Sequence, residues 1–124
     1  MLVDVQVRDE GDWTVVAVVG ELDLALAPRV RHAVIEALSP ARARSGPPQV
    51  VLDLEAVHFI DSSGLGLVLG VLRRVRQAGG TLRVVVVEPQ VTGLFALLGL
   101  DTIVDLRPSV ADALAVPAGG DRRG

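Results

Sequence analysis

Hydrophobic and polar positions recur with two different periods along this chain, and the periods separate strands from helices. Near the start, Val3, Val5 and Val7 alternate with polar residues, which predicts a half-exposed strand. The valine-rich run Trp13–Gly20 follows a Glu-Gly-Asp turn and predicts a second strand that forms a hairpin with the first. Three further apolar runs predict strands at Val50–Leu54, Leu82–Val87 and Ile103–Leu106.

Between the strands the apolar period becomes that of a helix. The first helix is predicted to bury Leu26, Val30, Ala33, Val34, Ala37 and Leu38 and to expose Arg29, Arg31, His32 and Glu36. Pro28 suits its first turn, where a missing N–H is not needed. Similar patterns predict helices at Ser62–Gln77, where Gly79 is expected as the positive-φ cap, and at Gln90–Leu98 and Pro108–Val116.

The order of elements, β-β-α-β-α-β-α-β-α, predicts the fold class. Strands joined by single helices pair in parallel through right-handed crossovers, whereas the hairpin makes the first strand antiparallel. The sequence therefore predicts one small α/β domain with a mixed sheet of four or five strands and about four helices. The unbroken valines of Leu82–Val87 predict a strand buried on both faces. Residues 39–49 are expected to be a mobile surface loop, and the Gly- and Arg-rich residues 117–124 a disordered tail after a domain of residues 1–116.

Composition narrows the classes of function. The 124 residues fit one domain, and with 50% hydrophobic but only 2% aromatic residues its core is aliphatic. The formal net charge of −3 argues against nucleic acid as a partner. The absence of cysteine excludes disulfides and thiolate zinc sites. No apolar run approaches the ~20 residues of a membrane span, and the first residues do not resemble a secretory signal, so we expect a cytoplasmic protein without a membrane partner.

The strongest candidates for a functional site lie where the third predicted strand ends and the second predicted helix begins. The open N–H groups and the partial positive charge of a helix start favour an anion. Here the sequence places Asp61, Ser62, Ser63 and Gly64. One hydroxyl, most simply that of Ser62, is expected to cap the helix, which leaves Ser63 exposed in the first turn.

One strip of that helix is unusually small and polar. It holds Ser63, Gly66, Gly70, Arg74 and Gln77. Two glycines inside a helix lower its stability by about 1 kcal/mol each relative to alanine, which is explained if another backbone approaches closely. This pattern predicts an outward-facing docking strip that begins at a modifiable hydroxyl. On spacing alone, simple capping and packing of the glycines within the domain remain the plainer interpretation.

Three segments resemble a known family. Asp61-Ser62-Ser63-Gly64-Leu65-Gly66, preceded by Val51-Leu52-Asp53-Leu54, resembles the core motif of STAS-domain anti-sigma factor antagonists. Gly20-Glu21-Leu22-Asp23-Leu24-Ala25 with Ala27-Pro28, and Leu94-Phe95 with Leu98-Gly99-Leu100, resemble two further segments of that family. The resemblance extends from about Val3 to Ala115 with the elements in the same order, and it favours the docking interpretation.

The resemblance implies a non-enzymatic partner-switching protein without a cofactor. Such proteins bind an anti-sigma factor, a serine kinase with a histidine-kinase-like ATP fold, and so release a sigma factor. The kinase phosphorylates the second serine of the motif, here Ser63 with Ser62 as the alternative, and a serine phosphatase reverses this. Asp23 and Asp61 match the family's two acidic positions near that serine. The expected partner-binding residues are Asp23, Asp61, Ser62, Ser63, Gly64, Gly66, Gly70 and Arg74.

Two features depart from the family pattern. Leu26 stands where the family commonly has Thr, and an apolar residue in place of an N-cap hydroxyl typically lowers stability by ~1 kcal/mol. The start of the first helix and any partner contact near it are therefore in question. The loop 39–49 is also longer than usual.

Alternative functions remain at this point. A STAS scaffold that is not phosphorylated, or a ligand-sensing module, fits the same resemblance. A serine hydrolase would need glycine two residues before its nucleophile, where Asp61 precedes Ser63, and a histidine within reach, whereas His32 is expected on an exposed helix face and His58 at a strand end. Two distant histidines predict no metal site, and without lysine no phosphate-binding loop is complete. Arg73, Arg74 and Arg76 are expected to form a solvated helix face or a rim of the docking site.

Overall fold

The computed structural model describes residues 4–39 and 46–115, and the predicted α/β class and order of elements are confirmed. The elements are β1 (Asp4–Glu10), β2 (Trp13–Leu22), α1 (Ala27–Ala37), β3 (Gln49–Ile60), α2 (Ser62–Gln77), β4 (Thr81–Val85), α3 (Pro89–Leu97), a 3-10 turn (Leu100–Thr102), β5 (Asp105–Arg107) and α4 (Val110–Ala115). Residues 40–45 of the expected loop and the expected tail 117–124 lie outside the described residues.

The five strands form one mixed sheet in the order β1-β2-β3-β4-β5. β1 pairs antiparallel with β2, and the remaining neighbours pair in parallel, as predicted. β4 is buried from Leu82 to Val85, which confirms a strand covered on both faces. α2 has the predicted bounds, and Gly79 beyond its end has a φ of +75°.

The third strand is longer than its sequence pattern predicts, because it continues to Ile60 rather than ending at Leu54. Its pairing with β2 explains the error. Ala17 pairs with Asp53 but Val19 with Ala56, so β3 carries one extra residue there, and a second shift follows before Ile60. Such bulges break the two-residue alternation, so the second half of β3 does not resemble a strand in sequence.

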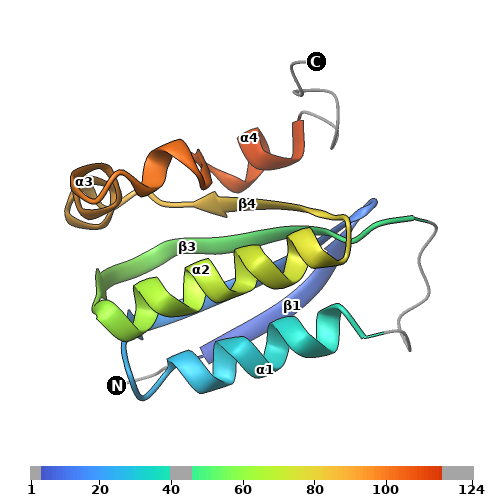
Figure 1. The fold of residues 1–124 in the computed structure, drawn as a ribbon, viewed down its shortest axis with the longest axis horizontal. Coiled ribbons are helices and arrows are strands. Elements are labelled where there is room, and N and C mark those ends of the chain that lie inside the picture. Colours follow the sequence, from blue (N-terminus) through green and yellow to red (C-terminus); the bar gives the residue numbers. More distant parts are fainter. Residues whose placement is uncertain (1–3, 40–45, 116–124) are drawn as a thin grey trace.

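Helices cover both faces of the sheet (Figure 1): α1 and α2 lie side by side on one face, and α3 and α4 lie on the other. The larger aliphatic core joins the sheet to α1 and α2 through residues such as Val16, Leu52 and Val71, and it extends to Phe95 of α3. A smaller cluster lies under α4 and contains Trp13, Val15, Val51, Val85 and Ala113. Among the described residues, no helix has both the length and the apolar character required to span a membrane.

Buried Arg83 attaches α4 to the sheet. Its side chain is 0% exposed, and its guanidinium carbon lies 4.7 Å from the centroid of the Trp13 ring. Its Nη1 donates a hydrogen bond of 2.6 Å to the carbonyl of Ala113, and its Nε lies 3.4 Å from Asp105 Oδ2. The last carbonyls of a helix lack partners within the helix, so Arg83 supplies one from the sheet.

We expect Arg83→Ala to lower the free energy of unfolding by about 2–4 kcal/mol, because it opens a cavity and leaves a buried carbonyl without its donor. Arg83→Met should lose less, since it keeps the packing against Trp13. Urea denaturation measures both. The control is Arg8→Ala, whose exposed pair with Glu10 is worth at most about 1 kcal/mol. If Arg83→Ala were as stable as the control Arg8→Ala, the structural role of Arg83 would be contradicted.

Candidate partner-docking site

Gly64 allows the start of α2 to lie directly against the end of β2. The residue is buried, and a Cβ there would collide with the carbonyl oxygen of Leu22 and lie 2.6 Å from Cγ1 of Ile60. The same Leu22 carbonyl accepts a 3.3 Å hydrogen bond from the N–H of Asp61. Because Leu22 is the last residue of β2, this contact brings Asp23 to the start of α2.

The N-cap of α2 is Asp61 and not Ser62, which corrects the expectation from sequence. Asp61 is extended, with φ −103° and ψ −173°, and its Oδ1 accepts a 3.0 Å hydrogen bond from the N–H of Gly64. Since β3 continues to Ile60, the helix begins immediately after Asp61, and aspartate caps as well as serine. Ser62 is exposed, while Ser63 is half-buried rather than fully exposed.

Asp23 organises the start of α1 in a similar way. Its Oδ1 accepts hydrogen bonds of 3.1 Å from the N–H groups of both Ala25 and Leu26. Leu26 occupies the N-cap position without a side-chain cap bond, and only 2% of it is exposed. The carboxylate of Asp23 therefore supplies the acceptor that the missing hydroxyl does not, and Leu26 contributes to the core instead.

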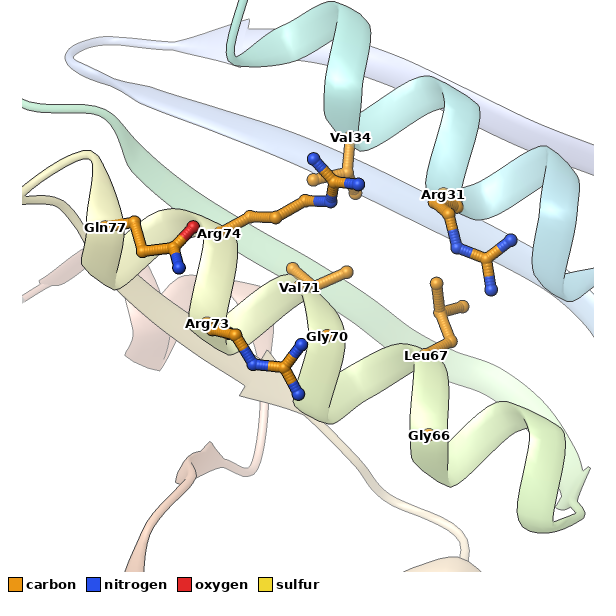
Figure 2. Close-up of a pocket in the computed structure, with 9 residues that line it drawn as sticks. All are labelled: Arg31, Val34, Gly66, Leu67, Gly70, Val71, Arg73, Arg74 and Gln77. Atoms are coloured by element: carbon orange, nitrogen blue, oxygen red, sulfur yellow. The ribbon is translucent and has the colours of Figure 1, made fainter.

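The strip predicted along α2 lies beside α1. Figure 2 shows Gly66, Gly70, Arg74 and Gln77 on the side of α2 that lines a groove of about 380 Å³ between the two helices. A Cβ at Gly66 or Gly70 would meet no atom within 4 Å. No described part of the domain packs against these two glycines, so packing within the domain does not account for them.

The structure divides the predicted residues into two neighbouring groups. Asp23, Asp61, Ser62, Ser63 and Gly64 lie at the junction of β2, β3 and α2. Gly66, Gly70 and Arg74 continue from there along the groove. Ser62, Ser63, Gly66, Gly70 and Arg74 follow one another along α2, and Asp23 lies beside its start at the end of β2. Gly64 is buried beneath this surface, so its role is to pack α2 on β2, and the expectation that it contacts a partner is corrected.

Sequence reasoning missed several residues of this surface. Arg31 lines the groove, although it was expected only as part of a solvated face of the first helix, whereas Arg73 lines it in agreement with its expected place on a solvated face or a rim of the docking site. Leu24 is 73% exposed just after Asp23, and Phe59 is 50% exposed just before Ile60 and Asp61. The available signal was the presence of these two large apolar residues next to the polar motif.

The histidines take no part in this arrangement. His32 is exposed on α1, as expected, and Nδ1 of exposed His58 lies 3.2 Å from Oε2 of Glu88. Among the described residues, no histidine is hydrogen-bonded to Ser62 or Ser63. The same residues contain no group of three or more histidine and acidic side chains arranged to hold a metal ion.

The mixed sheet with two helices on each face, and the serine motif at the head of α2, define a class of small α/β domains. The STAS domain family model matches residues 4–113. The chain belongs to the STAS domain family.

Individual relatives agree with this assignment. The anti-sigma F factor antagonist of Paenibacillus polymyxa is 34% identical over 100 residues, which are 81% of this chain and 82% of that protein. The crystal structure of an anti-sigma factor antagonist from Mycobacterium paratuberculosis is 31% identical and superposes with a TM-score of 0.79 over 92% of each chain. The phosphorylated form of the Bacillus cell-fate determinant SpoIIAA shares the fold, with 24% identity and a TM-score of 0.67 over 90% of this chain and 97% of that one.

The three glycines of α2 should respond differently to alanine. Gly64→Ala should destabilise the protein by about 1–3 kcal/mol, because its Cβ would collide with backbone. Gly66→Ala and Gly70→Ala should each stabilise it by up to about 1 kcal/mol, because alanine favours the helix and meets no neighbour. Thermal unfolding of the single variants measures the difference. A loss of stability in Gly66→Ala or Gly70→Ala would show that the domain itself requires these glycines.

Proposed function

We propose that this protein is an anti-sigma factor antagonist that binds a serine kinase acting as an anti-sigma factor, and that phosphorylation of Ser63 ends the complex. The observation that carries the proposal is the position of Ser63 at the head of an open strip of α2, outside the capping hydrogen bond of Asp61. The names of the relatives support an anti-sigma factor as the partner, and the assignment of that partner as a serine kinase comes from the family resemblance. SpoIIAA, which has this fold, has been solved in both phosphorylated and unphosphorylated forms.

Helical geometry favours Ser63 over Ser62 as the modified residue. An α-helix turns by about 100° per residue, so Gly70 and Arg74 lie within about 20° of Ser63 around the axis of α2. Ser62 lies about 80–120° from the same two residues by this geometry. A phosphoryl group on Ser63 would therefore project from the head of the strip, in line with Gly70 and Arg74.

The electrostatics support a change in binding rather than refolding. Phosphorylation adds about −1.5 to −2 charges at pH 7. The amino end of α2 would stabilise this charge by about 0.3–1 kcal/mol, whereas the neighbouring carboxylate of Asp61 would oppose it. A partner packed on the strip would have to bury or face a dianion, and each 1.4 kcal/mol of lost affinity weakens the complex about tenfold.

The kinase reaction tests the modification directly. After incubation with ATP and each candidate anti-sigma kinase of the source genome, mass spectrometry should find one phosphate on Ser63. Ser63→Ala should lose it, and the matched control Ser62→Ala should keep it. Phosphate on Ser62 would contradict the choice of residue. The absence of both phosphate and a nucleotide-dependent complex with every candidate kinase would favour an unphosphorylated scaffold or ligand-sensing module.

Partner binding provides a second test through the glycines. Gly66→Ala and Gly70→Ala should each weaken the kinase complex about tenfold, because a methyl group in a close interface typically costs about 1–3 kcal/mol. Gly93→Ala in α3 is the matched control, since it is also a helical glycine with nothing within 4 Å of a Cβ. Isothermal titration calorimetry should show normal affinity for Gly93→Ala. Equal affinities for all three variants would place the interface elsewhere.

A further inference from the structure

The seam between α1 and α2 carries a concentration of positive charge. Arg31, Arg73 and Arg74 are all exposed and line the groove of about 380 Å³, while Val34, Leu67 and Val71, which are buried, form its floor. In Figure 2, Arg31 projects from α1 toward α2, and Arg74 projects from α2 toward α1. No acidic side chain lines the groove, although the whole chain has a net charge of −3.

These three arginines have no partner among the described residues. None of them forms an ion pair or a side-chain hydrogen bond there. Other arginines are engaged: Arg83 contacts Asp105, and Arg107 contacts both Asp105 and Asp112. The fold therefore pairs arginines elsewhere but leaves three of them unpaired around one groove.

The dimensions of the seam favour a polypeptide as its occupant. A second cavity of about 380 Å³ continues the groove, shares Arg74 and Gln77 with it and adds apolar Ile35 and Leu38. From Gly66 to Ala78 the rise of α2 is about 18 Å, which equals about three helical turns. An open groove of this length matches one face of a short amphipathic helix better than a compact small molecule.

The rest of the chain does not supply a complementary charge. Residues 40–45 contain Arg42 and Arg44 but no acidic residue. Residues 116–124 contain Arg122 and Arg123 against one acidic residue, Asp121. An occupant drawn from either segment would bring net positive charge to an arginine-lined groove, so neither segment complements it, whereas an acidic partner does.

We propose that the α1–α2 groove binds an acidic amphipathic helix of a protein partner. Apolar side chains of that helix would pack against exposed Ile35 and half-buried Leu38, and carboxylates on its flanks would pair with the three arginines. Gly66 and Gly70 would allow its backbone to come close. The inference rests on the proposed function only where it identifies the partner as the anti-sigma kinase.

A designed peptide tests the groove without the kinase. The probe is a 15-residue helical peptide with a leucine and alanine stripe flanked by glutamates, and its control has lysine in place of each glutamate. Titrated into the full ¹⁵N-labelled chain, the acidic peptide should shift the amide resonances of Gly66 and Gly70, and its affinity should fall with added salt. Equal binding of the lysine peptide, or shifts confined to other surfaces, would overturn the proposal.

Charge reversal identifies the residues responsible. Arg31→Glu and Arg74→Glu should each weaken acidic-peptide binding at least tenfold, whereas Arg29→Glu, on α1 but outside the groove lining, should leave it unchanged. Circular dichroism checks that each variant folds, and sedimentation at high concentration tests for a second copy in the groove. Unchanged affinity in the groove variants, or a wild-type dimer that Arg31→Glu dissociates, would overturn the proposal.

The same variants separate this inference from the proposed function. If the kinase complex and Ser63 phosphorylation occur but neither peptide nor kinase affinity responds to Arg31→Glu and Arg74→Glu, the groove proposal fails and the function stands. If the acidic peptide binds as expected while no candidate kinase binds or modifies the chain, the function fails and the groove proposal stands.

Discussion

The contact between Gly64 and the carbonyl of Leu22 fixes the geometry on which the candidate site depends. Without a Cβ at Gly64, the first turn of α2 can lie on the last residue of β2, and the Asp61 N–H bonds to the same carbonyl. Two segments far apart in sequence, one ending in Asp23 and the other containing Ser63, thereby meet at the carboxyl ends of β2 and β3. A bulkier residue at Gly64 would have to displace backbone rather than a flexible side chain, so the constraint is rigid.

Asp23 and Asp61 both have a structural role that is separate from any contact with a partner. Asp61 accepts the N–H of Gly64 and Asp23 accepts those of Ala25 and Leu26, so each carboxylate holds the start of one helix. Because a carboxylate rather than a hydroxyl caps α2, Ser63 is not required for the cap. Chemical change at Ser63 would therefore alter the surface of α2 while the capping bond remains. The aspartates near the serine are explained first by helix capping, and any effect on a partner is additional.

The periodicity of apolar residues predicted most of the helices and strands. It failed for β3, whose length depends on its pairing with β2. The bounds of α2 were predicted because its apolar arc has a regular helical period over many turns. The length of β3 was not, because the extra residues opposite β2 interrupt its alternation. The groove was not predictable either, since Arg31 looks like an ordinary solvated residue until α1 and α2 are placed side by side. The strip on α2 could be located from one helix alone, whereas Arg31 on the opposite wall of the groove could not.

An open helical glycine is not by itself a sign of a docking surface, because Gly93 of α3 is equally open. What distinguishes Gly66 and Gly70 is their position between a serine at the helix start and arginines whose side chains have no partner among the residues that the structure describes. Gly66, where the groove starts, follows Ser63 by about one helical turn, so a phosphoryl group on Ser63 would lie roughly 5 Å from it along the axis. This distance is well within the Debye length of about 8 Å at physiological ionic strength. A dianion so placed would repel the acidic segment that the arginines attract. The two proposals then describe opposite signs of one electrostatic interaction along α2, with the arginines favouring the complex and phosphoserine opposing it.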